Sequence, residues 1–272
     1  MKNKVLAVLH FIVLSAVIYW SYYSNTGAVN NNTMATVSEK FDSLFTPAGY
    51  AFAIWGIIYI GLIGLGINMI IQAFRNISND HFIEKAAPTL ILSYIGNALW
   101  VWFWLNEQAG ISVIIMIFIL TMLIITVVRL NMQRWDAPLK YIAFVWWPID
   151  IYFGWISVAT IANISAYLKS IQWTGGLSEV TWTIIMIFVA TLLALYMTYL
   201  RNMREYAGVF IWAFIAIAVR HYGQISSITW CAIIGAIIIG IGSGIHAYKN
   251  RATNPFTRKV QPSINESTTS RN

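Results

Sequence analysis

Long apolar stretches separated by short polar segments make up most of this chain. About 20 apolar residues are enough to span the hydrocarbon core of a bilayer, and we count about eight such stretches. We expect the spans at roughly residues 5–23, 50–74, 87–105, 111–129, 140–165, 182–200, 206–222 and 226–248. The seventh is the shortest and contains Gly208, so it is either a tilted span or a re-entrant segment. The pattern predicts an all-α fold, a polytopic transmembrane helix bundle.

Composition agrees with a protein embedded in lipid, since 58% of the residues are hydrophobic and only 10% are charged. Of the 17 basic residues, only Lys40, Lys169 and Arg220 fall on the outer side if the N-terminus is inside. Lysine and arginine accumulate in cytoplasmic loops, so we expect both termini in the cytoplasm, in a bacterial inner membrane. The formal charge of +7 then reflects this topology and contact with anionic membrane lipid, not nucleic acid.

The ends of the chain and its longest loop add three expectations. Residues 1–23 resemble a signal peptide, but the apolar core is long and ends in an aromatic belt without a small-residue cleavage site, which favours a retained anchor. Residues 24–49 form a polar loop that we expect to fold over the mouth of the bundle. Residues 250–272 are predicted to be a disordered cytoplasmic tail. Cys231 is the single cysteine, which excludes an internal disulfide.

Aromatic and amide side chains recur on three of the expected helices. Phe52, Trp55 and Tyr59 follow the Pro-Gly turn in FTPAGYAFAIWGIIY and share one helical face. Asn97 and Trp100 share a face of the third span. The fifth span carries a stripe of its own, formed by Tyr152, Trp155, Ala159, Thr160 and Asn163. A rise of 1.5 Å per residue puts all three groups roughly 8–15 Å below the outer surface, apart from Asn163 near the rim. We therefore predict a cavity for a flat apolar ligand in the outer half of the bundle.

These motifs resemble those of the TspO/MBR family, the tryptophan-rich sensory or translocator proteins. That family has five helices, with a Pro-rich entry to the second followed by a W-x-x-x-Y-type pair, L-N-x-x-W on the third and P-Y-x-x-W-x-x-x-A-x-x-L-N on the fifth. Here the first motif is matched from Pro47 to Tyr59, the second by GNALW and the third by IYFGWISVATIAN. The resemblance covers about residues 5–165. It departs at Tyr50, where the family commonly has Trp, and at Ile151, which replaces the proline before Tyr152.

The resemblance implies a five-helix pocket that binds a tetrapyrrole such as porphyrin or haem, or a sterol-like molecule, for sensing or transport. Its residues would be Pro47, Phe52, Trp55, Tyr59, Asn97, Trp100, Tyr152, Trp155 and Asn163. Since the family has nothing that matches the last three spans, we expect three parts: residues 1–168, a TspO/MBR-like domain; 169–249, an added three-helix unit; and 250–272, the tail. A resident cofactor is not implied, and packing between helices remains the competing interpretation of each aromatic residue.

Asp150 is a carboxylate well inside a span, where a charge costs at least about 2.5 kcal/mol. It points away from the Trp155 stripe and would face the added helices, either as a proton or substrate site between the two halves or as a protonated acid bonded to a carbonyl freed by Pro148. The first reading gives an alternative function, a permease-like transporter with a path past Asp150.

Other candidate chemistry is sparse. His10, His81, His221 and His246 are not at i, i+4 spacing, so no metal site is predicted, and no nucleophile triad or phosphate loop is found. We therefore expect a binding protein and not an enzyme, with porphyrin degradation as the enzymatic alternative. Gly240 and Gly244 form a GxxxG pattern, which favours close helix contact within the chain or in a homodimer.

Overall fold

The computed structural model describes residues 1–75 and 81–251, so the predicted tail from residue 252 onward lies outside the described residues. Within these ranges the chain is helical and contains no β-strand, which confirms the all-α prediction. The main helices are α1 (Lys2–Tyr23), α2 (Met34–Phe41), α3 (Ile54–Arg75), α4 (Phe82–Leu105), α5 (Ala109–Arg129), α6 (Leu139–Tyr141), α7 (Trp147–Ser170), α8 (Glu179–Arg201), α9 (Arg204–His221) and α10 (Ser226–Lys249). A short 3₁₀ turn, η2 (Gly49–Ala53), leads into α3, and the wide turns η1 (Ser24–Ala28) and η3 (Ile142–Trp146) extend α1 and precede α7.

Seven helical segments in the described residues are long and apolar enough to cross a membrane. The exception among the eight expected spans is α9, which is 18 residues long and carries Arg204, Glu205 and Arg220. Most of its apolar side chains are buried inside the protein, including Phe210 and Phe214, both at 0% exposure, whereas Ile215 and Val219 are exposed. The apolar pattern of α9 therefore reflects mainly burial against other helices.

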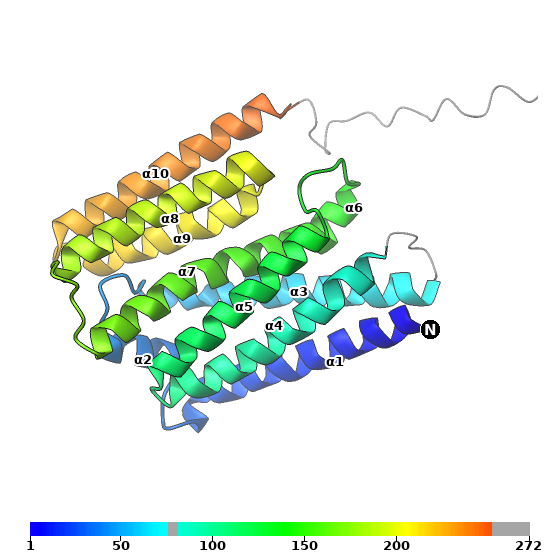
Figure 1. Cartoon of the computed structure of the whole chain (residues 1–272), viewed down its shortest axis with the longest axis horizontal. Coiled ribbons are helices and arrows are strands. Elements are labelled where there is room, and N and C mark those ends of the chain that lie inside the picture. The colour runs from blue at the N-terminus through cyan, green and yellow to red at the C-terminus, as the bar shows by residue number, and fades with distance from the viewer. Residues whose placement is uncertain (76–80, 252–272) are drawn as a thin grey trace, which may run out of the picture.

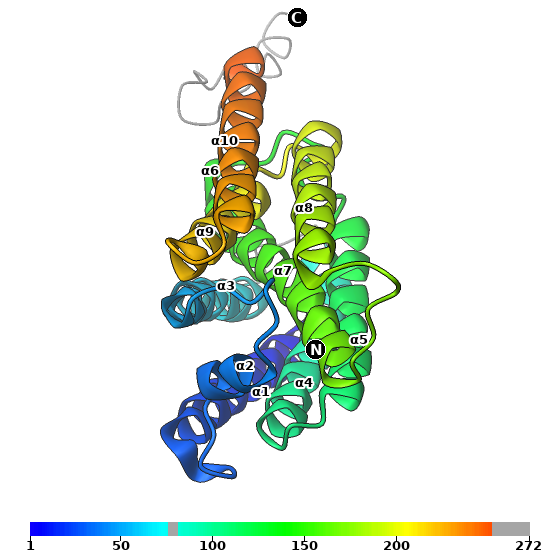
Figure 2. The same ribbon diagram turned by 90° about the vertical axis from the view of Figure 1, so that its left-hand side faces the viewer.

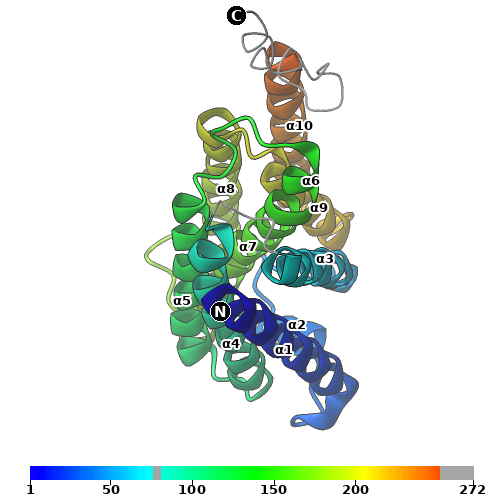
Figure 3. The same cartoon turned by 90° about the vertical axis from the view of Figure 1, so that its right-hand side faces the viewer.

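The long helices form two groups. Helices α1, α4, α5, α7 and α3 pack pairwise in that order, and α3 returns to α1, so they close into a five-helix ring. Helices α8, α9 and α10 all pack on one another. Figure 1 shows these three on one side of the ring, and Figure 2 shows α9 above α3 and α7. The described part of α1 begins and that of α10 ends at the same end of the bundle (Figures 1 and 3).

The two groups meet chiefly where α9 packs on α7. Gly154 of α7 allows the close approach, since a Cβ atom there would lie 3.0 Å from the backbone oxygen of Tyr206 and 3.0 Å from Cβ of Val209. The rings of Phe153 and Tyr206 pack beside it, 4.9 Å apart. The two groups of helices are therefore joined by a close crossing of α7 and α9 at Gly154.

Large apolar side chains cover the outer surface of the helices, including Ile60 at 74%, Trp230 at 62% and Phe188 at 61% exposure. Such a surface requires lipid around it. Gly240 and Gly244 also lie on the exposed side of α10, whereas Gly235 and Gly242 make the close contacts to Phe214 and Leu195. The exposed GxxxG pattern is thus left uncovered by the other described helices, and a homodimer stays a prediction.

One helix was not predicted from the sequence. Helix α2 lies in the segment expected to be a loop, and it begins with a capping box in which the side chains of Thr33 and Thr36 bond each other's backbone amides. It ends at Phe41, and the left-handed backbone of the next residue, Asp42 (φ 47°), turns the chain. We call residues 34–48 the lid, and the end of the bundle where it lies the lid end.

Candidate ligand-binding site

A small cavity lies under the lid, within the five-helix ring. Its volume is about 40 Å³, and we call it the tryptophan chamber. It is lined by Ser38, Thr46, Pro47, Phe52, Trp55, Trp100, Trp104, Met116, Trp155, Val158, Ala159, Ala162 and Asn163. The ring supplies walls from α3, α4, α5 and α7, and the lid and η2 supply the roof.

Four aromatic rings fix the shape of the chamber. The rings of Phe52 and Trp155 meet edge to face with 6.0 Å between centroids. Trp100 stacks on Trp104 at 5.7 Å and 17°. Such offset and edge-on contacts each stabilise a pair by about 0.5–1.5 kcal/mol beyond burial. The chamber walls are therefore held in place by their own packing.

The amide of Asn163 supports the wall from behind. Its Oδ1 accepts hydrogen bonds from Nε1 of Trp100 at 2.9 Å and from Oγ of Ser112 at 3.2 Å, and its Nδ2 approaches the same Ser112 oxygen at 2.8 Å. Its polar atoms are thus engaged by α4 and α5. Asn163 therefore orients the Trp100 ring, and its hydrogen-bonding groups are already occupied by protein partners.

Trp55 differs from Trp100 in this respect. It stacks on Tyr59 with 5.2 Å between centroids and is 7% exposed. Its Nε1 has no hydrogen-bond partner among the residues that the structure describes. A buried N–H without an acceptor costs about 1–3 kcal/mol. Since Trp55 lines the chamber, a bound molecule that reached this N–H would supply the missing acceptor.

Six of the nine residues named from the sequence line the chamber, and three lie behind it. Tyr59 donates from its hydroxyl to Oγ of Ser21 at 2.8 Å. Tyr152 packs against Trp55 with 6.0 Å between ring centroids. Asn97 is 2% exposed, and its Oδ1 has no partner within the described part of the chain. These three residues support the chamber wall instead of bordering the cavity.

Sequence reasoning missed the contributions of the lid and of α5. Ser38 and Thr46 come from the segment read as a loop, and Met116 comes from a helix in which no polar or aromatic stripe stood out. The signal for the lid was available in the Thr33-x-x-Thr36 capping pattern. Met116 had no distinguishing signal, because methionine is a common filler of helix interfaces.

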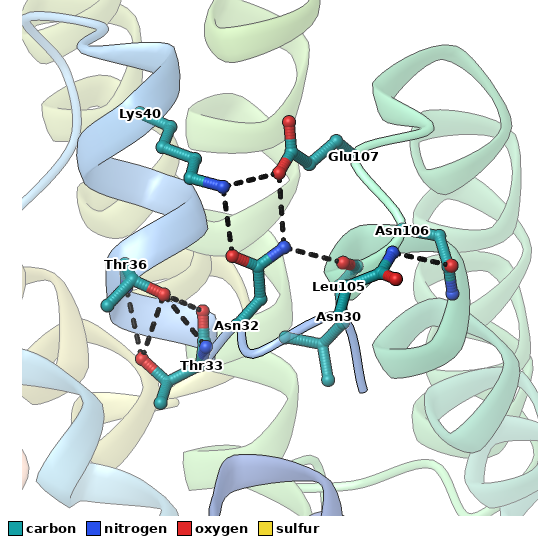
Figure 4. A network of polar contacts seen from close by, with 8 residues as sticks. All are labelled: Asn30, Asn32, Thr33, Thr36, Lys40, Leu105, Asn106 and Glu107. Atoms are coloured by element: carbon teal, nitrogen blue, oxygen red, sulfur yellow. Dashed lines mark hydrogen bonds and ion pairs between the residues drawn. The ribbon is translucent and has the colours of Figure 1, made fainter. Parts of the chain in front are cut away.

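A polar network, shown in Figure 4, fixes the start of the lid to the end of α4 and to the turn between α4 and α5. Asn32 donates to the carbonyl of Leu105 at 2.9 Å and to Oε1 of Glu107 at 3.1 Å. Nζ of Lys40 lies 2.6 Å from the same Glu107 oxygen. The hydrogen bond from Lys40, and then that from Asn32, hold the pKa of Glu107 below its usual value. The network fixes where α2 begins.

A second cavity of about 220 Å³ adjoins the chamber at the opposite end of the lid. We call it the vestibule. Ser38, Thr46, Pro47 and Phe52 line both cavities. A third cavity, of about 370 Å³, lies between the end of α7 and the start of α8, where Trp173, Trp182 and the ion pair of Lys169 with Glu179 form its wall.

Asp150 does not line the chamber and lies near the start of α7. It is 0% exposed, and its Oδ2 accepts a hydrogen bond from Nε2 of Gln133 at 2.9 Å. Its Oδ1 has no partner within the described ranges. Its side chain lies within the range of electrostatic interaction with Glu205 of α9. Asp150 therefore faces the added helices.

The histidines lie apart from one another. His10 of α1 contacts the hydroxyl of Tyr94 at 3.1 Å, whereas His246 of α10 packs against Tyr199. His221 lies at the lid end, with its Nε2 2.9 Å from the carbonyl of Leu44. Within the described residues no group of three or more histidine, cysteine or acidic side chains is arranged to hold a metal ion.

The sequence matches the model of a known protein family. A family model described as TSPO-like protein matches residues 7–245. The chain belongs to this family. The match runs from α1 into α10 and so includes the three helices after α7. No curated protein and no solved structure matches the chain.

Proposed function

We propose that this TSPO-like protein binds a tetrapyrrole, or a similarly planar apolar molecule, in the tryptophan chamber and acts as a sensor or carrier of that ligand. The observation that carries the proposal is the free Nε1 of Trp55, buried among Trp100, Trp155 and Phe52. Three indoles favour a flat aromatic guest, and the free donor favours one with a hydrogen-bond acceptor. The ring nitrogens and carboxylates of a porphyrin meet that requirement.

Binding requires the chamber to open. Its volume of about 40 Å³ is far below the roughly 300–1,000 Å³ of sites for small molecules. The adjoining vestibule adds about 220 Å³, and residues of the lid and η2 line both cavities. We infer that the lid is the part that moves when a ligand enters.

The direct test is titration of the purified protein in detergent with protoporphyrin, followed by quenching of tryptophan fluorescence. Saturable quenching is expected for the wild type, and Trp155→Ala should weaken it at least tenfold. Trp230→Ala is the matched control, since Trp230 is 62% exposed on α10. Absence of saturable quenching in the folded wild type would reject the proposal. The porphyrin absorbance is recorded in light and dark to detect any degradation.

A second candidate function is supported by the junction of α7 and α9. Asp150 and Glu205 are two acids near each other in an interior, and each has a buried oxygen without a partner in the described structure. Such a pair is typical of proton sites, because two close carboxylates cannot both stay ionised. A transporter with a path along this junction is the alternative function.

Uptake of protoporphyrin into proteoliposomes under an imposed pH gradient separates the two functions. If the chain is a transporter, Asp150→Asn should abolish gradient-driven uptake while binding persists, since asparagine can still accept from Gln133. Glu84→Gln is the control, since Glu84 pairs with Lys2 away from the lid and from the junction of α7 and α9. Equal uptake with and without the gradient would reject the transporter and leave ligand binding as the only one of the two functions.

We also propose that both termini face the cytoplasm of a bacterial inner membrane. The basis is the distribution of basic side chains, which leaves only Lys40, Lys169 and Arg220 at the lid end. Labelling of single introduced cysteines in intact cells tests this: Ser170→Cys at the lid end should react with an impermeant reagent, and Asn250→Cys should not.

A further inference from the structure

The vestibule is a second cavity on the line from the chamber to the lid-end surface. Beyond the four residues it shares with the chamber, its wall contains Glu39 of the lid and Arg220 of α9. Glu39 is exposed to solvent. The vestibule therefore lies between the tryptophan chamber and the aqueous surface, and its floor is the lid segment that closes the chamber.

Helix α9 holds this end of the lid. Nη1 of Arg220 donates to the carbonyls of Ser43 at 3.2 Å and Thr46 at 2.9 Å, and its Nη2 donates to Oδ1 of Asp42 at 3.0 Å. His221 contacts the carbonyl of Leu44, as described above. We call Arg220 and His221 the latch.

Backbone and neighbouring contacts extend the same attachment. The amide of Ala48 donates to the carbonyl of Ala216 at 3.2 Å, and Nε1 of Trp212 donates to the carbonyl of Ala51 at 3.1 Å. From α8, Oε1 of Glu179 accepts from the amide of Leu44 at 3.2 Å. Each of these partners belongs to α8 or α9, so the three-helix group holds the lid segment from residue 42 onward.

We propose that the vestibule is the entrance by which a ligand reaches the tryptophan chamber from the aqueous side, and that the latch on α9 keeps this entrance closed. The proposal extends the proposed function and rests on it for the identity of the ligand. It predicts entry beneath the lid, between α9 and η2, and not between helices from the lipid. Release of the lid at residues 42–48, with its first end still fixed to Glu107, would join the two cavities.

The contacts of the latch are expected to contribute unequally. The Arg220 side chain is 19% exposed, whereas that of Asp42 is 72% exposed, so solvent weakens their ion pair. The two carbonyls that Arg220 bonds lie deeper, at Ser43 and Thr46, which are 3% and 4% exposed. A lysine at this position offers a point charge and cannot reproduce the planar fork. Opening should therefore increase most in Arg220→Ala, less in Arg220→Lys and least in Asp42→Asn.

Thiol labelling tests the entrance without any porphyrin. Cys231 is first replaced by alanine, and Ala159, which lines the chamber, is replaced by cysteine. The probe is a charged, membrane-impermeant methanethiosulfonate, and the readout is the modification rate in proteoliposomes. We expect Arg220→Ala to raise this rate at least tenfold and Asp42→Asn to raise it less than threefold. Arg251→Ala, at the other end of the bundle, is the matched control and should leave the rate unchanged.

Three results would overturn the proposal. They are an unchanged rate in a folded Arg220→Ala protein, fast labelling of the Ala159→Cys protein with the latch intact, and an equal increase in the Arg251→Ala control. If Arg220→Ala does not fold, Arg220→Lys tests the proposal in its place, and its labelling rate should lie between that of the wild type and the rate expected for Arg220→Ala. A further result is that the wild type fails to bind protoporphyrin although the labelling rate changes in the latch variants as expected. That result would support the entrance and reject the ligand named in the proposed function.

A locked lid gives the converse result. With Cys231 removed, Asp42→Cys and Arg220→Cys can be joined by a short reversible bis-methanethiosulfonate, because the native side chains are in contact. Protoporphyrin association should be at least as fast as in the wild type before cross-linking, at least tenfold slower after it, and restored by a reductant. Association unaffected by the cross-link would show that ligands enter elsewhere.

Discussion

Replacing Trp55 and Trp100 by phenylalanine tests the unpaired indole N–H in the chamber. Both side chains are buried, at 7% and 5% exposure, and both line the same cavity. Each replacement removes the same ring volume, so the cost of the void, about 24 cal/mol per Å³, largely cancels in the difference. What remains is the effect of the indole N–H. That of Trp100 donates to Asn163, whereas that of Trp55 has no acceptor in the described structure.

The magnitude follows from those two environments. Trp100→Phe removes a hydrogen bond to Asn163, which contributes about 1 kcal/mol and somewhat less between helices in a membrane. Trp55→Phe removes a donor whose burial without a partner costs about 1–3 kcal/mol. Trp100→Phe should therefore be the less stable variant by about 2 kcal/mol. Reversible unfolding by SDS in mixed micelles, followed by circular dichroism, measures the difference.

Ligand affinity should respond in the opposite order. If the bound molecule accepts a hydrogen bond from Trp55, Trp55→Phe loses about 1 kcal/mol of binding, or roughly fivefold in Kd. The variant with the smaller loss of stability would then bind protoporphyrin less tightly than Trp100→Phe. The reasoning is refuted if Trp55→Phe is destabilised as much as Trp100→Phe, because the N–H of Trp55 would then have a partner in the folded protein.

Two further predictions concern the junction and the lid. Gly154→Ala should destabilise the fold by about 1–3 kcal/mol in the same SDS titration, because the added Cβ is overpacked against Tyr206 and Val209. Gly56→Ala is the control. A Cβ there meets no atom within 4 Å, so this variant should be neutral or more stable. Because the folded-state pKa of Glu107 is lowered, its stabilising contribution is complete above the usual pKa and disappears as the pH falls through the lower folded value. The protection factors of the α2 amides, from which the intrinsic pH dependence of exchange is removed, should fall over that acidic interval in the wild type, and Glu107→Gln should show weakened protection without the pH step.

The sequence was sufficient for the long helices and for much of the chamber. Apolar runs predict spans because lipid leaves the backbone no partner outside a helix, and the i, i+3, i+4 spacing places Trp55, Trp100 and Trp155 on inward faces. It also placed Asp150 opposite Trp155, toward the added helices, as the structure has it. These predictions depend on geometry within one helix, which the sequence fixes.

The features that the sequence could not supply depend on contacts between distant segments. Asn163 was named as a ligand-binding residue, but only the tertiary structure shows its amide bonded to Trp100 and Ser112. Arg220 was counted as one of the few outer basic residues, and its bonds to Ser43 and Thr46 span more than 170 residues of sequence. Helix α9 was predicted to be a tilted span or a re-entrant segment, because a buried helix and a lipid-facing one have similar apolar patterns.

If the tryptophan chamber is the binding site proposed above, the three helices after α7 contribute to it, because they hold its lid. The five-helix ring fixes only the first end of the lid, through Leu105 and Glu107, and Trp104 adds one bond to the carbonyl of Met34 at 3.3 Å. From residue 42 onward the polar contacts of the lid with other helices go to α8 and α9 within the described structure. The ring without these helices would keep its tryptophans but leave the roof of the chamber attached at one end. A closed chamber in this protein therefore requires both groups of helices, which agrees with a family match that continues through both of them.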